Sequence, residues 1–301
     1  MAASAASRDR ELGVVDLRPR RGRLLSLWKI ARNKPVGAIA GFICIGLIIV
    51  ALTADVLAPH GAASVSHPRL QPPSLSYPFG TDNLFRDMFS RVLIGSRISL
   101  GIGFTAVAIG TVLGTTVGLV SGYAGGWADL VLNRVMDVIL GFPPLLLAMF
   151  FLSIFDPTSF SVSMAIGIII TPATARIVRG SVLSIRTLQY IEAAQAVGNT
   201  SLRIMLRHVL PNVVAPIIVV ATIQIGNAIL AEAALSFLAL GIATDSNPSW
   251  GKMLQDTRAV WQTAWWTAVI PGAAISIAVL SFNLFGDALR DVLDPRLRQS
   301  S

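Results

Sequence analysis

Apolar runs of about 20 residues recur along this 301-residue chain, and they constrain its fold more than any other feature. A helix of about 20 apolar residues crosses the roughly 30 Å of hydrocarbon in a bilayer. Only 13% of the residues are charged, against roughly 25% in soluble domains. One such run would suggest an anchor, whereas repeated runs indicate a bundle. The sequence therefore predicts an all-α, polytopic membrane protein.

Six runs are predicted to span the membrane. They cover residues 36–58, 98–123, 137–155, 160–178, 212–235 and 266–289. The third run is the weakest, because Asn133, Arg134 and Asp137 crowd its start. Pro143 and Pro144 also interrupt it, and proline removes a helical hydrogen bond. Six spans nevertheless remain the expected count.

Basic residues are distributed asymmetrically about these runs. Nine of the 24 lysines and arginines precede the first run, and placing both termini in the cytoplasm leaves 18 inside and 6 outside. Cytoplasmic loops of membrane proteins carry such an excess. Segment 1–35, in which Leu24, Leu27 and Trp28 share a helical face, is predicted as a basic cytoplasmic segment with an interfacial helix on membrane lipid. The net charge of +8 is not spread as a groove would require, which disfavours nucleic acid as a partner.

The same topology assigns the remaining segments. Residues 59–94 are polar and rich in proline, which indicates an external loop. Residues 95–290 are predicted as a core of five spans, and residues 291–301 as a cytoplasmic tail. The basic stretch before the first run is over thirty residues long, which argues against a cleaved signal peptide.

Glycines recur every four residues in the second run. Gly110, Gly114 and Gly118 share one helical face, and small side chains allow helices to approach closely in lipid. We expect this face to contact another helix, with one of the same chain favoured over one of a partner subunit.

Four tryptophans lie beside the last span or in the segment before it. They are expected to form an aromatic belt at the membrane interface: Trp250, Trp261, Trp265 and Trp266.

The connection at residues 190–211 has the pattern of a structured element. Good helix formers come first, and Gly198 and Asn199 suit the left-handed conformation that ends a helix. Thr200 or the next serine suits the cap of a second helix. The sequence therefore predicts two short helices joined by a tight turn, with another tight turn at Pro211.

This connection also presents a surface of small and charged residues. The alanines would let another protein's backbone approach closely, and the two arginines lie one turn apart on the second helix. We favour the interpretation that this surface binds another protein. A helix held on the membrane surface by anionic lipid is the alternative. The residues concerned are Glu192, Ala193, Ala194, Ala196, Arg203 and Arg207.

At this point the chain resembles a known family. The string Glu192-Ala193-Ala194, followed by Gly198 and Leu210-Pro211, resembles the EAA loop of binding-protein-dependent ABC importer permeases. Further segments are similar to signatures of the dipeptide and oligopeptide permeases of the C type, in the expected order, so that the resemblance runs from about Leu24 to Arg296. These segments are 78–91, 95–100, 234–241, 248–251 and 283–296.

The resemblance implies a type I ABC importer permease fold for peptide import in the cell inner membrane. It implies a homologous second permease, two ATPase subunits and an external substrate-binding protein as partners. Residues 190–211 would then form a coupling helix hairpin in a groove of the ATPase. The coupling residues implied are Tyr190, Glu192, Ala193, Ala194, Ala196, Gly198, Arg203, Arg207, Leu210 and Pro211.

The chain has no nucleotide-binding signature. A phosphate-binding loop needs Gly-Lys-Ser/Thr, and none of the three lysines, Lys29, Lys34 and Lys252, has that context. No catalytic residue, cofactor or metal is therefore predicted on this chain. ATP and Mg are expected on the partner subunits.

Asp137, Glu232 and Asp287 each lie in or at the end of a predicted span, where charge is costly and often marks a transport path. Glu232, together with Ser236, is the candidate for the translocation path, whereas Asp287 is expected to pair with Arg290. A proton-driven secondary transporter using Asp137 and Glu232 as a relay is the alternative function, although the inverted repeats common in such carriers are not found.

Overall fold

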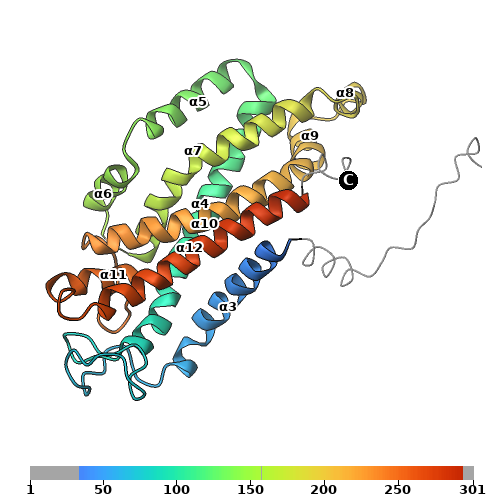
Figure 1. Cartoon of the computed structure of the whole chain (residues 1–301). Helices are drawn as coiled ribbons and strands as arrows, with labels where there is room; N and C mark the ends of the chain where they lie inside the picture. Colours follow the sequence, from blue (N-terminus) through green and yellow to red (C-terminus); the bar gives the residue numbers. More distant parts are fainter. Residues whose placement is uncertain (1–33, 157, 294–301) are drawn as a thin grey trace, which may run out of the picture. The chain divides into compact units, whose positions relative to one another are not determined.

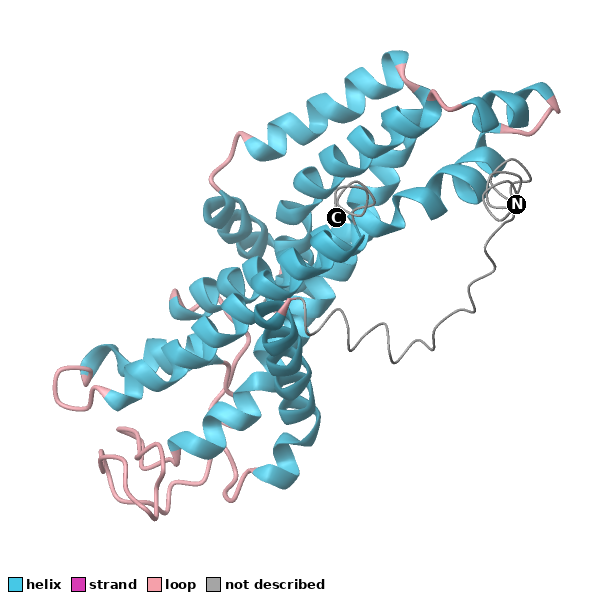
Figure 2. Cartoon of the chain, turned by 45° about the vertical axis from the view of Figure 1, so that its right-hand side comes forward, coloured by secondary structure: helices cyan, strands magenta, loops and turns pink. Residues whose placement is uncertain are grey.

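The computed structural model describes residues 34–156 and 158–293. Their secondary structure is helical apart from an isolated β-bridge between Thr81 and Asp87. Most loops lie at the two ends of the bundle (Figures 1 and 2). The predicted interfacial helix, most of the basic N-terminal residues and most of the tail lie outside the described residues.

Five helices among the described residues are long and apolar enough to cross a membrane. This confirms the predicted all-α membrane bundle. They are α3 (Pro35–Leu57), α4 (Met88–Ala124), α7 (Ser159–Arg186), the continuous helix Ser201–Phe237 that contains α10 (Leu210–Phe237), and α12 (Trp266–Leu293).

The predicted third span is a broken helix. It consists of α5 (Gly126–Leu140) and α6 (Pro144–Ile154), whose axes are bent by 93° at the intervening break. The expected start at residue 137 is therefore wrong, and six spans result only if this pair counts as one. Pro144 has no N–H for a helical hydrogen bond, and Pro143 disfavours helical backbone at the residue before it.

The helix that contains the second predicted span begins at Met88, before the apolar run, so the loop predicted to be external ends at residue 87 rather than 94. Asp87 caps α4, because its carboxylate accepts hydrogen bonds from the backbone N–H groups of Phe89 and Ser90 at 3.3 and 3.1 Å. Arg91 in the first turn is 1% exposed and is covered by neighbouring loops. Hydropathy alone misplaces this helix start, since Ser90 and Arg91 in its first turn are polar and yet buried.

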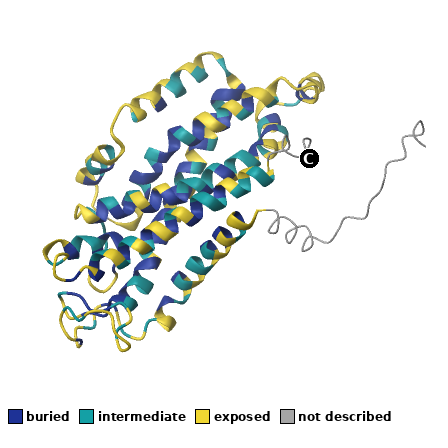
Figure 3. Ribbon diagram, in the orientation of Figure 1, coloured by how far each residue is buried: buried dark blue, intermediate teal, exposed yellow. Residues whose placement is uncertain are grey.

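The glycine face of α4 packs against α7. A Cβ atom on Gly114 would lie 2.6 Å from the Cβ of Thr174, and one on Gly118 would lie 2.5 Å from the carbonyl oxygen of Ala175. The prediction that this face contacts a helix of the same chain is confirmed. Buried residues concentrate on the central helices, whereas α5 is largely exposed (Figure 3).

One end of the bundle carries residues 58–87 and 238–265, which we call the cap. Its helix α11 (Trp250–Asp256), extended by a 3-10 turn at Thr257–Ala259, was not predicted from the sequence. Ser249 caps α11 by accepting a hydrogen bond from the backbone N–H of Lys252 at 3.2 Å. The other end carries residues 187–209, which we call the hairpin.

The aromatic belt prediction is wrong for two of its four tryptophans. Trp250 is 1% exposed and donates from Nε1 to the carbonyl oxygen of Val92 at 3.0 Å. Trp266 is buried and donates to the carbonyl oxygen of Thr81 at 3.1 Å. A buried indole N–H needs an acceptor, and these two hydrogen bonds help to hold the cap on the bundle. Trp261 and Trp265 are exposed.

Candidate coupling site

The hairpin consists of α8 (Gln189–Ala196), a turn, α9 (Ser201–Ile204) and a π-helical turn at Met205–Val209. Gly198 adopts φ of +85°, in the left-handed region that favours glycine. The N–H of Gly198 donates to the carbonyl of Gln195 at 2.9 Å, and the N–H of Asn199 donates to that of Ala194 at 3.2 Å. The predicted short first helix and the glycine turn are confirmed, whereas the second predicted short helix is the start of the continuous helix Ser201–Phe237.

The exit from the hairpin differs from the prediction of a tight turn at Pro211. The chain passes without a break from the π-helical turn into α10, and Leu210 donates its N–H to the carbonyl of Met205. Pro211 lies just after the π-helical turn, inside the continuous helix Ser201–Phe237. Thr200 stands at the cap position of α9, although its side chain makes no capping hydrogen bond.

The inner side of the hairpin is packed into the bundle. Ile191 and Ile204 are fully buried, and Ala194 is 9% exposed. The prediction that Ala194 presents a surface to another protein is therefore wrong, because this alanine belongs to the packed side of α8. The cluster combines residues of α4, α7, the hairpin and α10: Leu119, Tyr123, Val178, Val182, Ile191, Ala194, Ile204, Val209 and Val213.

The outer side of the hairpin is exposed and mixes apolar with charged residues. Three exposed apolar side chains were missed by the sequence analysis, namely Val197 at 83%, Leu202 at 62% and Leu206 at 53% exposure. Their apolar type alone could not reveal them, because it suits a core as well as a contact surface. The other exposed members of the predicted site are Tyr190, Glu192, Ala193, Ala196, Gly198, Arg203, Arg207 and Pro211, and Leu210 is half-buried.

Polar contacts also join the hairpin to the spans. The side-chain amide of Asn212 in α10 donates to the hydroxyl of Tyr190 at 3.3 Å. Gln195 donates from Nε2 to the hydroxyl of Tyr123 in α4, also at 3.3 Å. A force on the outer side of the hairpin would therefore be transmitted to several spans, because interiors packed this closely behave as stiff bodies.

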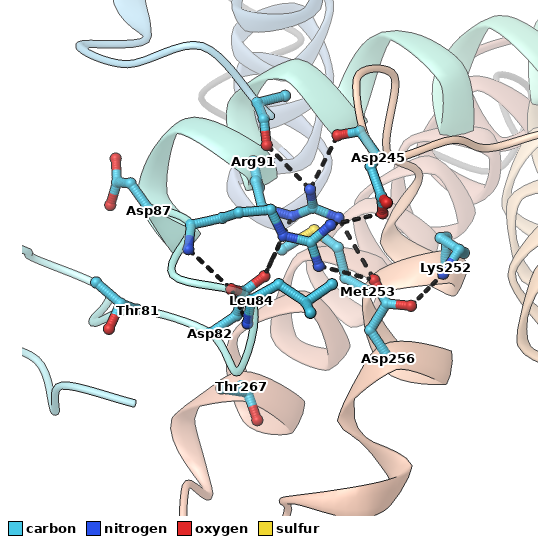
Figure 4. A network of polar contacts seen from close by, with 12 residues as sticks. Thr81, Asp82, Leu84, Asp87, Arg91, Asp245, Lys252, Met253, Asp256 and Thr267 are labelled. Carbon is cyan, nitrogen blue, oxygen red and sulfur yellow. Dashed lines mark hydrogen bonds and ion pairs between the residues drawn. The ribbon is translucent and has the colours of Figure 1, made fainter. Parts of the chain in front are cut away.

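The cap at the other end is held by an ion-pair network around two buried arginines, Arg86 and Arg91 (Figure 4). Arg86 is 2% exposed, and its Nε contacts Oδ2 of Asp82 at 2.6 Å. Its two terminal nitrogens donate to the carboxylates of Asp245 at 2.6 Å and Asp256 at 3.1 Å. Arg91 donates to the carbonyl oxygen of Asp245 at 3.1 Å. This network links α4 and the loop before it to α11 and the loop that precedes it.

Arg86 and Asp245 favour each other's charged forms. Burial acts to lower the pKa of Arg86, but the neighbouring carboxylates outweigh it and hold the pKa above its ordinary value. Burial acts to raise the pKa of Asp245, but the hydrogen bond from Arg86 outweighs it and holds the pKa below the usual range. Both residues therefore remain ionised at neutral pH.

Replacing Arg86 with methionine is expected to destabilise the protein by about 3–5 kcal/mol, because it removes the guanidinium that contacts the buried carboxylate of Asp82 at 2.6 Å. Thermal unfolding of the purified protein in detergent would measure the change. Arg97→Met is the matched control, since Arg97 pairs with Asp55 at 2.9 Å but both side chains are exposed. The Arg97→Met variant is expected to lose at most about 1 kcal/mol of unfolding free energy. Equal losses in the two variants would contradict the role given to the network.

Glu232 and Ser236, the two residues predicted for the path, are both buried in this structure. Glu232 is 1% exposed and accepts hydrogen bonds from Ser99 at 3.0 Å and Ser236 at 2.7 Å. The hydroxyl of Ser99 also accepts from the backbone N–H of Trp250 at 3.1 Å. These hydrogen bonds form a buried polar network that joins α4, α10 and α11, and the role of Glu232 and Ser236 in the path stays a prediction.

The other two acidic residues also differ in their surroundings. Asp137 pairs with Arg176 at 2.6 Å, and both side chains are about half exposed. The expected pair of Asp287 with Arg290 is not formed within residues 34–156 and 158–293, although the two lie one turn apart on α12. Arg290 is exposed at the hairpin end of that helix.

Comparison with known proteins decides the family. Residues 114–299 match the family described as binding-protein-dependent transport system inner membrane component. This chain belongs to that family. Its curated relatives include the dipeptide transport system permease protein DppC of Alkalihalophilus pseudofirmus, 45% identical over 87% of this chain and 86% of the relative. The glutathione transport system permease protein GsiD of Escherichia coli is 42% identical over 90% of both chains.

Solved structures of ABC transporters share the fold of this binding-protein-dependent transport component. A chain of the MetNI methionine ABC transporter in inward-facing conformations has a TM-score of 0.57 and 19% identity, covering 69% of this chain and 98% of that one. An amino acid ABC transporter crystallised with histidines has a TM-score of 0.50 and 18% identity, covering 68% and 92%. The expected type I importer permease fold is confirmed. The family and the apolar helices together make the chain a multi-pass inner-membrane protein.

Proposed function

We propose that this chain is one of two homologous membrane-spanning subunits of an ATP-driven importer for short peptides. Relatives at 42–45% identity are named as permeases for dipeptides and glutathione, both of which are small peptides. Two ATPase subunits, an external substrate-binding protein and the second permease would complete the complex. Both termini and the hairpin would then lie in the cytoplasm, as the basic residues favour.

The observation that carries the proposal is the two-sided hairpin. Its inner side is buried among residues of α4, α7 and α10, whereas its outer side exposes Glu192, Val197 and Leu202. A loop that only connects two spans needs neither an exposed apolar surface nor an inner side packed against the bundle. The arrangement suits a lever that receives force from a partner and passes it to the spans.

The work of this chain would be a change between two packings of its spans. ATP bound with Mg on the partner subunits supplies the energy. The hairpin moves with those subunits, and α7 and α10 move with the hairpin because they are packed against its inner side. The chain's own residues thereby transmit a displacement from one face of the membrane to the other.

Reconstitution in proteoliposomes tests the proposal. The complete complex should take up a labelled dipeptide, alanyl-alanine, only when ATP reaches the ATPase side and the binding protein is on the other side. A protonophore should leave the rate unchanged. Uptake that follows a proton gradient without ATP would contradict the proposal and support the secondary transporter.

Glu192→Lys is expected to lower peptide uptake about tenfold or more while ATP hydrolysis continues, because hydrogen bonds to charged groups contribute about 1.5–3 kcal/mol. Glu192 is exposed, so the subunit should still fold and reach the membrane. Uptake and ATP hydrolysis measured in the same vesicles would show the loss of coupling. Gln189→Lys, at an exposed position one turn earlier, controls for added charge. Unchanged uptake in Glu192→Lys would exclude a coupling role for this side chain.

A further inference from the structure

A groove of about 530 Å³ runs along the hairpin half of α10, within the roughly 300–1,000 Å³ typical of small-molecule sites. Its α10 residues recur at spacings of three and four, so they form one continuous face of the helix. Ile177 of α7 borders this face, as do Arg290 and Leu293 of α12. The residues of α10 are Asn212, Ala215, Pro216, Val219, Val220 and Ile223.

The groove is mostly apolar but contains one unpaired cation. Arg290 is exposed, and no hydrogen bond or ion pair is found for it in the part of the chain that the structure describes. By contrast, Arg176 and Arg179 in α7 pair with Asp137 and Asp129, each at 2.6 Å. A free guanidinium at an apolar groove suits an anionic group, and carboxylates match its geometry.

The groove also contains an acceptor created by proline. Pro216 lies inside α10 and has no N–H, so the backbone carbonyl of Asn212 loses its usual donor four residues later. Because the two residues lie on the same helical face, this carbonyl borders the groove. The side-chain amide of Asn212 is occupied elsewhere, since it donates to the carbonyl of His208 at 2.7 Å and to Tyr190.

We infer that this groove is a binding station for the peptide on the hairpin side of the translocation path. The carboxylate of the peptide pairs with Arg290, its N–H groups donate to the carbonyl of Asn212, and its apolar side chains contact Val219 and Ile223. An acceptor, a cation and an apolar wall together complement a zwitterionic peptide better than they complement a lipid chain. The inference rests on the proposed import of peptides and adds the residues that receive the cargo.

Protection of an introduced thiol tests the inference directly. Val220→Cys places a thiol in the groove, and Cys44→Ser removes the single native cysteine, which is buried. Alanyl-alanine added to the hairpin side of the assembled complex should slow labelling of this thiol by N-ethylmaleimide. The amidated dipeptide, which lacks the carboxylate, should protect at concentrations about tenfold higher, because a charge-assisted hydrogen bond is lost.

Variants of Arg290 provide the controls. Arg290→Gln should raise the concentration of alanyl-alanine needed for protection about tenfold, and Arg290→Lys should restore much of the difference. Arg134→Gln, at an exposed arginine of α5, should have no effect. Each variant is first required to assemble and to hydrolyse ATP, which separates a binding defect from misfolding.

The outcomes separate this inference from the proposed function. Absence of protection, or equal protection in Arg290→Gln, in a complex that still imports the dipeptide with ATP would overturn the inference alone. If anionic lipid blocks labelling of the thiol and the peptide leaves the labelling rate unchanged, the inference is also overturned, and the groove binds lipid instead. Failure of the unmodified complex to import any peptide would instead count against the proposed function.

Discussion

Gly198→Val is expected to lower ATP-driven peptide uptake about tenfold or more, because left-handed backbone costs an L-residue about 1–2 kcal/mol and a β-branched residue more. A Cβ atom at this position would meet nothing within 4 Å. The effect would therefore come from the backbone alone, through a turn that no longer holds α8 and α9 in register. Uptake and ATP hydrolysis measured in the same proteoliposomes would show the loss.

Two matched variants isolate that cause. Gly198→Asn should retain most of the uptake, since asparagine tolerates the left-handed region. Gly180→Val lies on α7 in open space without a positive φ, and it should also retain uptake. A Gly198→Val complex that transports as fast as the unmodified one would show that the geometry of the turn is irrelevant.

The double variant Gly114→Ala with Gly118→Ala is expected to destabilise the protein by about 2–6 kcal/mol, the sum of two overpacked sites. The added methyl groups would lie 2.6 Å from a carbon atom of Thr174 and 2.5 Å from the carbonyl oxygen of Ala175. Backbone cannot move aside as a flexible side chain does, so α4 and α7 would be forced apart. The thermal unfolding midpoint of the purified protein would fall accordingly.

Gly101→Ala is the control on the same helix. Its added methyl group meets nothing within 4 Å, and alanine favours a helix over glycine by about 1 kcal/mol. The unfolding midpoint should therefore stay the same or rise. A similar fall in both variants would mean that alanine itself, and not the contact with α7, disturbs α4.

The spans and the hairpin were predictable because their signals are local. Apolar length identified the five long helices, and the glycine at residue 198 marked the turn, since only a few residue types suit the left-handed conformation. The spacing of Gly110, Gly114 and Gly118 likewise predicted a helix contact. Such features follow from a single stretch of sequence.

The remaining features depend on contacts between distant residues. Arg86 and Arg91 are polar and were placed in an external loop, yet both are buried by partners as remote as Asp245 and Asp256. Ala194 carries the same side chain as its exposed neighbour Ala193, and only the packing of α8 against the bundle distinguishes the two. Sequence could not supply these partners, because burial of a charge is decided by tertiary structure.

Site-specific photo-cross-linking from α8 tests the coupling claim most directly. A photoreactive residue at Ala193 or Ala196, both exposed, should form a product with an ATPase subunit in the assembled complex. The same residue at buried Ala194 should cross-link within the chain or disrupt the hairpin. Cross-linked products of Ala193 and Ala196 that never include an ATPase subunit would contradict the account. Products formed only with a protein on the external side of the membrane would contradict it as well.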